Sequence, residues 1–321
     1  MQILVTGAAG FIGANITEKL LSEGHSVVGV DNLNDYYDVS LKQARLSKIQ
    51  AHPDFTFKEC DIVDRRVMSQ LFESNLFDVV VHLAAQAGVR HSIDNPQSYI
   101  DSNLVGFGNV LEGCRLNKIE HLVYASSSSV YAGNDNFPFN EKDPVDTPVS
   151  LYAATKKANE LMAHSYNELY GFRCTGLRFF TVYGPWGRPD MAPFLFAEKM
   201  LQGQVISVFN QGKMVRDFTY IDDVCNGVLR VALSNNDEKP YKVYNIGRGE
   251  PVELMDFIDL LGMHLGVEAK INFMPMQAGD VVGTMADTTE LKNDFDYQPE
   301  VSISAGVKSF ADWYKKYFHG A

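Results

Sequence analysis

The sequence predicts an α/β protein built on a doubly wound parallel sheet, accompanied by a smaller α/β domain. Short apolar strands alternate with helical patterns through the first half of the chain, and a glycine-rich turn joins the first strand to the first helix. Buried strands separated by helices form parallel sheets covered on both faces, and right-handed crossovers favour the doubly wound order. Beyond residue 179 the spacing loosens and proline and glycine cluster in residues 183–189, which indicates a second unit.

The elements can be placed in chain order from their apolar patterns. The expected strands are Gln2–Thr6, Ser26–Asp31, Phe55–Cys60, Asp78–Leu83, His121–Ser126 and Arg173–Phe179. The expected helices are residues 11–23, Asp64–Glu73, Pro96–Leu116, Tyr152–Tyr170, Ile221–Leu233, Glu253–Leu265 and Ser304–Tyr317. We expect a loop at Asn32–Tyr37 and a surface turn at Ser234–Pro240. Residues 1–178 plus 218–248 should form the doubly wound domain, and 179–217 plus 249–321 the smaller one.

Composition excludes several classes of protein. The formal net charge is −12 and the pI about 5.1, which argues against a nucleic-acid binder or a polybasic membrane patch. No apolar run approaches the ~20 residues that span a bilayer. The histidines lack metal-ligand spacing, so no metal is expected. The scattered cysteines indicate a reducing, cytoplasmic location rather than a disulfide framework; they are Cys60, Cys114, Cys174 and Cys225.

The turn after the first strand has the pattern GxxGxxG, formed by Gly7, Gly10 and Gly13. Glycines at such a turn let the backbone approach a pyrophosphate, and the helix that follows supplies unpaired N–H donors and a favourable dipole. A glycine triplet alone is weak evidence, because glycines also mark ordinary turns. Its place between a strand and a helix makes a dinucleotide site the better interpretation.

Asp31 ends the second predicted strand, 18 residues beyond Gly13. A carboxylate there can accept hydrogen bonds from the adenosine ribose hydroxyls and would repel a 2′-phosphate. We therefore predict NAD rather than NADP as the cofactor. Asp61-Ile62 follow the third strand and the run from Leu83 to Ala85 the fourth, where small residues would let a dinucleotide lie against the backbone.

Tyr152 and Lys156 form a YxxxK motif at the start of a predicted helix. Positions i and i+4 share one helix face, so the ammonium can lie beside the phenol and favour phenolate. Lowering a phenol pKa from about 10 to near 7 requires about 4 kcal/mol. A cation ~4 Å away at an effective dielectric of ~20 provides about that much. The serines of residues 126–129 end the fifth strand, where a hydroxyl can share a proton with a neighbouring phenol.

With these motifs in order, the chain resembles the extended short-chain dehydrogenase/reductases, whose core is a Rossmann sheet. More narrowly it resembles the nucleotide-sugar 4-epimerases, UDP-glucuronate 4-epimerases above all. The resemblance covers nearly the whole chain and includes AAQAGVRHS (84–92), YASSSSVYAG (124–133), YAATKKANE (152–160), LRFFTVYGPWGRPDMA (177–192), FNQGKMVRDFTYIDDV (209–224) and MQAGDV (276–281).

The resemblance implies roles for the matching positions. Tyr152 would be the general base, Lys156 would hold the nicotinamide ribose, and Ser127, which lies 25 residues before the tyrosine, would bind the sugar oxygen. The implied NAD-binding residues are Gly7, Gly10, Phe11, Ile12, Gly13, Asp31, Asn32, Asp61, Ile62, Leu83, Ala84, Ala85, Gln86, Ser126, Tyr152, Lys156 and Phe179. The implied UDP-sugar-binding residues are Arg90, Ser127, Ser128, Ser129, Phe180, Thr181, Arg188, Phe209, Arg216 and Asp280, with Arg216 on the diphosphate.

The resemblance also implies C4 epimerisation, most simply of UDP-glucuronate to UDP-galacturonate through a transient 4-keto sugar, and a homodimer formed through helices 96–116 and 152–170. Three alternatives remain open. The sugar could be UDP-N-acetylglucosamine or its uronic acid, the reaction could be dehydration or decarboxylation, or the protein could bind NAD without catalysis. Related dehydratases and decarboxylases carry an acidic residue in the segment equivalent to 126–130, where this chain has serines followed by Val130, so elimination is disfavoured.

Overall fold

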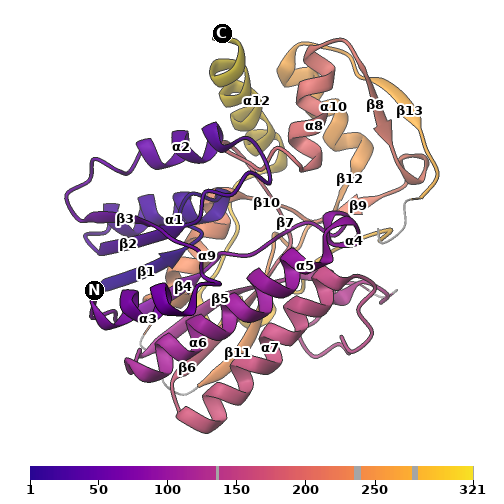
Figure 1. Ribbon diagram of the computed structural model, residues 1–321. Coiled ribbons are helices and arrows are strands. Elements are labelled where there is room, and N and C mark those ends of the chain that lie inside the picture. The colour runs from indigo at the N-terminus through magenta and orange to yellow at the C-terminus, as the bar shows by residue number, and fades with distance from the viewer. Residues whose placement is uncertain (135–136, 235–239, 277–280, 321) are drawn as a thin grey trace.

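A seven-stranded parallel sheet forms the centre of the computed structural model, which describes residues 1–134, 137–234, 240–276 and 281–320 (Figure 1). The strand order is β11-β6-β5-β4-β1-β2-β3, and every pair is parallel. The strands are β1 (Gln2–Thr6), β2 (Ser26–Asp31), β3 (Phe55–Glu59), β4 (Val79–His82), β5 (His121–Ser127), β6 (Arg173–Phe179) and β11 (Tyr241–Ile246). This is the predicted doubly wound fold, with β11 as a strand that the sequence analysis did not identify.

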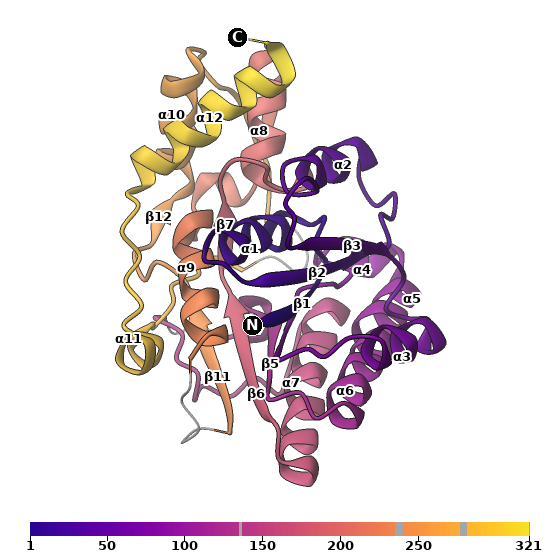
Figure 2. The same cartoon turned by 90° about the vertical axis from the view of Figure 1, so that its left-hand side faces the viewer.

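Helices cover both faces of the sheet (Figure 2). One layer contains α1 (Phe11–Ser22), α2 (Val39–Ser47) and α9 (Ile221–Ala232). The opposite layer contains α3 (Arg65–Glu73), α6 (Phe107–Leu116) and α7 (Leu151–Tyr170). The predicted helix 96–116 is a succession of α5 (Pro96–Tyr99), the π-helical segment η1 (Ile100–Gly106) and α6, with a short α4 (His91–Asp94) before it.

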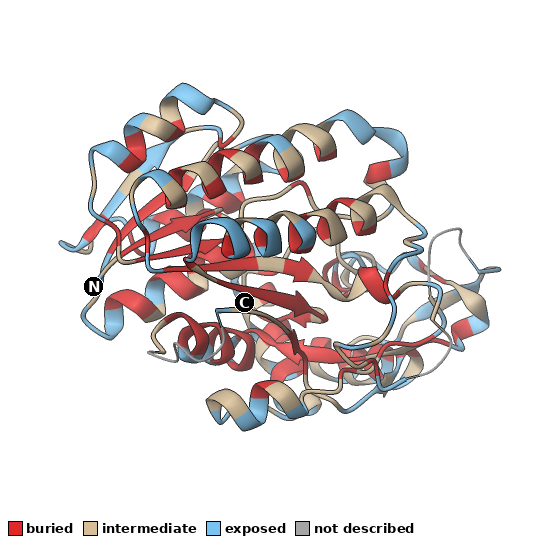
Figure 3. Cartoon of the chain, turned by 90° about the horizontal axis from the view of Figure 1, so that it is seen from below, coloured by how far each residue is buried: buried red, intermediate tan, exposed pale blue. Residues whose placement is uncertain are grey.

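The central strands are buried on both sides, which explains their apolar runs, whereas the edge strand β3 is mostly exposed. In β4, Val79 and Val81 pack into the core on the side of α1, whereas Val80 packs into the core on the side of α6. Ile3 and Leu4 of β1 divide in the same way. Figure 3 shows the buried strands between the exposed outer faces of the helices.

A second lobe lies beyond the carboxyl ends of the strands (Figure 1). Its helices are α8 (Ala192–Leu201), α10 (Leu254–Leu265) and α12 (Ile303–His319), which pack on one another around Phe257 and Phe310. Three two-stranded sheets complete it, pairing β7 (Thr181–Tyr183) with β10 (Phe218–Tyr220), β8 (Val205–Val208) with β13 (Lys270–Phe273), and β9 (Val215–Arg216) with β12 (Val252–Glu253). The remaining elements are η2 (Ser128–Tyr131), η3 (Asn210–Gly212) and α11 (Thr289–Phe295).

Helix α11 packs against β11 and α9 on the side of the large sheet, although it belongs to the C-terminal segment. Asp294 of this helix accepts hydrogen bonds from Lys242 at 2.9 Å and from the Tyr244 hydroxyl at 2.6 Å. The chain therefore returns to the first lobe after building part of the second. The domain boundaries at 178, 217 and 248 stay a prediction.

Candidate active site

A cavity of about 1020 Å³ opens between the carboxyl ends of the large sheet and the second lobe. It lies where the strand order reverses, between β1 and β4, which is the place where open α/β sheets bind ligands. Its volume lies at the upper end of the range for ligand-binding pockets. All the cofactor-binding and substrate-binding residues expected from the sequence line this one cavity, except Asp280, which lies outside the described residues.

The glycine turn is shaped by contacts that leave no room for side chains. Gly7 has a φ of +73°, and a Cβ added there would lie 2.8 Å from the backbone nitrogen of Ala84. A Cβ on Gly13 would lie 2.0 Å from the carbonyl oxygen of Gly7. Helix α1 begins directly after this turn. Its N-cap residue is Gly10, which has no side chain to cap the first amides of the helix. The first amides of the helix therefore face the cavity as donors for an anion.

Asp31 is fixed beside this turn. Its carboxylate accepts hydrogen bonds from the backbone nitrogens of Ala9 at 3.1 Å and Leu33 at 2.9 Å. Asp61 at the end of β3 is held by the Asn32 amide at 3.0 Å. Two carboxylates thus mark the end of the cavity at which the sequence placed the adenosine, and each is oriented by neighbouring groups.

Tyr152 and Lys156 stand one turn apart in α7, whose start is capped by the Ser150 side chain on the backbone nitrogen of Ala153 at 3.1 Å. The Lys156 ammonium is buried, donates to the Ala125 carbonyl at 2.9 Å and lies 6.0 Å from the centre of the Tyr152 ring. Burial lowers the pKa of Lys156 to about 8. Burial raises the pKa of Tyr152, while its hydrogen bond with Ser127 and the Arg188 cation oppose that rise.

The serine run divides into groups with different partners. Ser127 accepts a hydrogen bond from the Ser129 hydroxyl at 2.8 Å and lowers the pKa of the Tyr152 phenol. Ser126 instead donates its hydroxyl to Glu160 at 2.7 Å and is 2% exposed. Ser127 is thus the serine of this run that acts on the Tyr152 phenol, and its role toward the sugar stays a prediction.

Arg188 enters the same region from the second lobe. Its guanidinium holds Asp190 through two hydrogen bonds of 3.0 and 2.5 Å, and the Tyr36 hydroxyl donates to the same carboxylate at 3.0 Å. Burial opposes ionisation of Asp190, but the Arg188 cation and these bonds keep its pKa below the usual value. Phe179, Phe180 and Thr181 line the adjoining wall.

The far end of the cavity is bounded by residues from both lobes. The Arg90 guanidinium lies over the Phe209 ring, 5.4 Å from its centre. Arg216 donates to the carbonyls of Val215 and Val282 at 2.9 and 3.2 Å. Arg90 belongs to a loop of the large sheet, so this contact bridges the two lobes at the end where the sequence placed the nucleotide.

Arg45 of α2 is a structural residue of the site that the sequence analysis did not identify. It is 1% exposed and donates to the carbonyls of Ala9 at 3.1 Å, Trp186 at 2.8 Å and Gly187 at 3.0 Å, and to the Tyr37 hydroxyl at 2.6 Å. The guanidinium thus ties the glycine turn to the turn that carries Arg188. Its partners include main-chain carbonyls far along the chain, so no local pattern could have revealed it.

Other residues missed from the sequence are Tyr36, Tyr37, Lys42, His91, Asp190 and Lys199, all of which line the cavity. Among the lining residues, six are lysine or arginine and four are aspartate, so the cavity is locally basic in a protein of net charge −12. Such a lining suits an anionic ligand.

Within the described ranges, no three His, Cys, Asp or Glu side chains are grouped to hold a metal ion. No helix in the described part of the chain is long and apolar enough to cross a membrane.

Comparisons with known proteins agree with this geometry. Residues 3–247 match the model of the NAD dependent epimerase/dehydratase family. The chain is 51% identical to Protein CapI of Staphylococcus aureus over 99% of both chains. It is 46% identical to UDP-glucuronate 4-epimerase 1 of Arabidopsis thaliana, over 99% of this chain and 77% of that one. The crystal structure of a UDP-glucuronic acid 4-epimerase from Bacillus cereus, in complex with UDP-glucuronic acid and NAD, is 34% identical, with a TM-score of 0.93 over 99% of this chain and 100% of that one.

Proposed function

Because the chain belongs to the NAD dependent epimerase/dehydratase family, we propose that it is an NAD-dependent 4-epimerase that interconverts UDP-glucuronate and UDP-galacturonate. One observation carries the proposal. A single cavity is lined by the glycine turn after β1, by Tyr152, Lys156 and Ser127, and by the basic residues Arg90 and Arg216. It therefore offers a dinucleotide site and a nucleotide-sugar site that share the Tyr152 region.

The glycine turn fits NAD. The lack of side chains on Gly7 and Gly13 lets the turn pack closely on Ala84 and on itself, and the first amides of α1 would then bind the pyrophosphate at the cavity. Asp31 stands where it can accept from ribose hydroxyls and repel a 2′-phosphate. Bound NAD would accept the hydride from C4 of the sugar and return it to the opposite face.

Three residues would handle the proton. Tyr152, as phenolate, takes the proton of the 4-hydroxyl while the C4 hydride leaves, and later returns it to the oxygen of the 4-keto sugar. Lys156 stabilises the phenolate and holds the nicotinamide ribose. Ser127, which lies near the phenol and lowers its pKa, would orient the reacting oxygen. Proton and hydride both return to the substrate, so the reaction leaves no net redox change.

The second lobe would anchor the rest of the substrate. Arg188, Thr181, Ser128 and Ser129 would receive the sugar carboxylate, for which a guanidinium is well suited. Phe209, Arg90 and Arg216 would hold the uridine diphosphate. The sugar would turn about its bond to the diphosphate while this anchor stays fixed, and the closed lobe would keep water from the intermediate.

The direct test is to incubate the purified protein with UDP-glucuronate and follow the sugar by proton NMR. We expect UDP-galacturonate to accumulate to an equilibrium mixture. UDP-N-acetylglucosamine and its uronic acid, run in parallel, test the alternative sugars, and release of water or carbon dioxide would reveal a dehydratase or decarboxylase. Absence of turnover with all of these sugars would contradict the proposal.

The variant Tyr152→Phe provides the matched control. Loss of the general base should lower kcat by at least about 10²–10⁴-fold, the usual contribution of general acid–base catalysis. NAD content and the unfolding transition should be unchanged, since the ring and its packing remain. Near-normal epimerisation by this variant would show that another group is the base.

We also propose a homodimer formed through the helical layer of α6 and α7. Exposed apolar side chains follow this layer, with Val105 at 42%, Leu116 at 60%, Leu161 at 59% and Leu169 at 70%. Two-fold pairing of such helices would cover them. Light scattering after size exclusion should give twice the monomer mass for the wild type. The variant Leu161→Lys should lower the measured mass toward that of the monomer. A monomeric wild type would exclude this interface. The cytoplasmic location stays a prediction.

A further inference from the structure

The end of β5 is attached to α7 by three successive contacts. The Ala125 carbonyl accepts from Lys156 at 2.9 Å, the Ser126 hydroxyl donates to Glu160 at 2.7 Å, and Ser127 lies near the Tyr152 phenol, whose pKa it lowers. The helix residues are four apart, so they lie on one face of α7. Three consecutive residues of the strand therefore meet three turns of the helix, although not in the same order, and the Ser126–Glu160 contact lies next to the two that the proposed chemistry uses.

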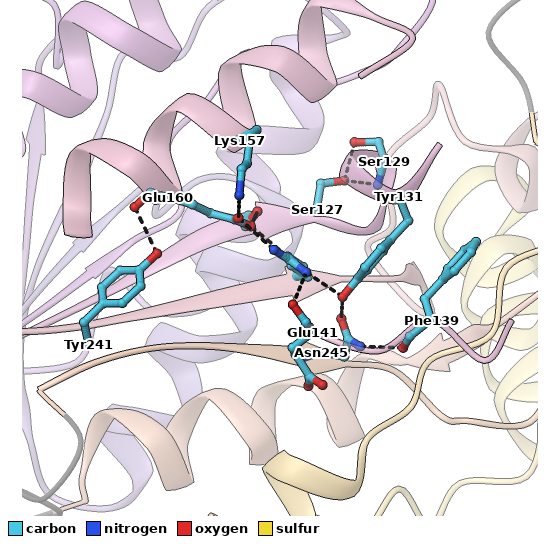
Figure 4. A network of polar contacts seen from close by, with 11 residues as sticks. Ser127, Ser129, Tyr131, Phe139, Glu141, Lys157, Glu160, Tyr241 and Asn245 are labelled. Atoms are coloured by element: carbon cyan, nitrogen blue, oxygen red, sulfur yellow. Dashed lines mark hydrogen bonds and ion pairs between the residues drawn. The ribbon is translucent and has the colours of Figure 1, made fainter. Parts of the chain in front are cut away.

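Glu160 is fixed on its other side by Arg178 of β6. The guanidinium donates through Nε to one carboxylate oxygen and through Nη2 to the other, both at 2.8 Å (Figure 4). Glu160 and Arg178 are 2% and 3% exposed. A buried bidentate ion pair restricts both partners to one arrangement, which makes Glu160 a rigid acceptor for Ser126.

The sheet register carries this attachment across three strands. Ser126 of β5 lies beside Arg178 of β6, which lies beside Asn245 of β11. Arg178 also donates to the Tyr131 hydroxyl at 2.7 Å, and that hydroxyl donates to Asn245 at 2.8 Å. Tyr131 ends the short helix that follows the serines, so the same guanidinium holds the chain on both sides of Ser127 (Figure 4).

We propose that Glu160, anchored by Arg178, is a positioning residue that acts through Ser126 to set the distance between Ser127 and Tyr152. This inference rests on the proposed function, in which those two groups handle the proton. It extends the motif to Tyr-x₃-Lys-x₃-Glu. The Ser126 side chain then positions the end of β5 through Glu160 and does not contact the cofactor.

The test compares Ser126→Ala with Tyr241→Phe in the NAD-loaded protein. Tyr241→Phe is the matched control, because its hydroxyl donates at 2.9 Å to the backbone carbonyl of the same Glu160 and, within β5, acts on the Tyr124 phenol rather than on the serines. We expect Ser126→Ala to lower kcat by about 10- to 100-fold, as small misplacements of reacting groups do, with a smaller change in KM. Tyr241→Phe should keep the wild-type kcat.

A second readout does not depend on turnover. With tyrosine rings labelled by ¹³C, the resonance missing in Tyr152→Phe belongs to Tyr152, and its titration gives the pKa of that phenol. Ser127 lowers this pKa, so Ser126→Ala should move the midpoint upward and Tyr241→Phe should not. The other groups that act on the phenol, Lys156, Arg188, Asp190 and the ring of Tyr99, are unchanged in both variants.

Glu160→Gln completes the design. If Ser126 and Glu160 act through one contact, the double variant should lose no more activity than the worse single variant, in contrast to independent sites, whose effects add. An unshifted Tyr152 midpoint in Ser126→Ala, or an equal shift in Tyr241→Phe, would overturn the inference. A wild-type protein that turns over no UDP-sugar would instead refute the proposed function, while the titration would still decide whether Glu160 positions these groups.

Discussion

Lys156 is a buried cation with one carbonyl as its fixed partner, and this environment determines when it is charged. Its pKa falls to about 8 because burial disfavours the ammonium. The proton is therefore present below that pH and is lost above it.

We expect kcat to decline as the pH rises through about 8, because a neutral Lys156 no longer stabilises the Tyr152 phenolate. The measurement is the pH profile of epimerisation under saturating substrate, with stability checked at each pH. A kcat that stays level well above this pH would show that the charge of Lys156 is not needed.

Single residues differ in how far the sequence reveals them. Tyr152 and Lys156 follow from a helix spacing, which is local, whereas the strand end indicates only the serines of residues 126–129 and the family resemblance selects Ser127 among them. Arg45 could not be predicted, because two of its carbonyl partners, at Trp186 and Gly187, lie 141 and 142 residues away. Asp190 was likewise missed, since only the fold brings the Tyr36 hydroxyl to it.

At the scale of elements, the turn between β1 and α1 depends on the absence of side chains. Gly13→Ala would place a Cβ 2.0 Å from the Gly7 carbonyl oxygen, so the turn must open. We expect this variant to lose bound NAD and about 1–3 kcal/mol of unfolding free energy, in the range of overpacking substitutions. NAD retained after gel filtration and the urea midpoint measure the two effects.

Gly24→Ala is the control for this variant, since nothing lies within 4 Å of a Cβ there, although its φ of +81° adds some backbone strain. It should destabilise the protein without releasing NAD. If Gly13→Ala kept its cofactor as firmly as Gly24→Ala does, the turn would not be the pyrophosphate site.

The strands β1, β2, β4, β5 and β6 were predicted because they are rich in apolar residues, and β3, an edge strand of mixed pattern, was predicted as well. Helix α8 was missed although it is largely apolar, since it follows the loop rich in proline and glycine. β11 was missed because Tyr241–Ile246 alternates polar and apolar residues at the other edge, where Lys242 pairs with α11. Helix α2 was missed because its exposed face is polar and its buried face includes Lys42 and Arg45.

For the molecule as a whole, stability should depend on two buried neutral histidines. Burial lowers the pKa of His82 and His121 to about 3. Arg173 donates to Nδ1 of His121 at 2.9 Å, so the Nε2 proton is the one that meets Thr175. Because their unfolded pKa is about 6.5, the unfolded state binds protons first as the pH falls.

Their contribution is complete above about pH 6.5 and is lost progressively toward pH 3. We expect the unfolding free energy to fall by about 1.4 kcal/mol per histidine for each pH unit below that point. Urea titrations at pH 7.5 and 5.5 measure the change, and His121→Gln should reduce the slope by about half. An unaltered slope would assign the pH dependence to other groups.

The two lobes are also joined through Arg45, which lies between them as a buried cation. Arg45→Met would leave the carbonyls of Ala9, Trp186 and Gly187 without this donor, at a cost of about 1–3 kcal/mol for each buried group left unsatisfied. We expect both NAD retention and the affinity for UDP-sugar to fall together. Loss of only one of them, measured by calorimetry on the same preparation, would contradict a shared support.

That shared support has a consequence for changing the enzyme's preferences. Substitutions in residues 184–190 that admit a different sugar would also move the carbonyls to which Arg45 donates. Through Arg45 they would disturb the glycine turn that is proposed to bind the dinucleotide. Selectivity and cofactor retention are therefore linked traits in this scaffold. A screen for new substrates should therefore include added NAD. Without it, variants that accept the new sugar but bind NAD more weakly would be scored as inactive.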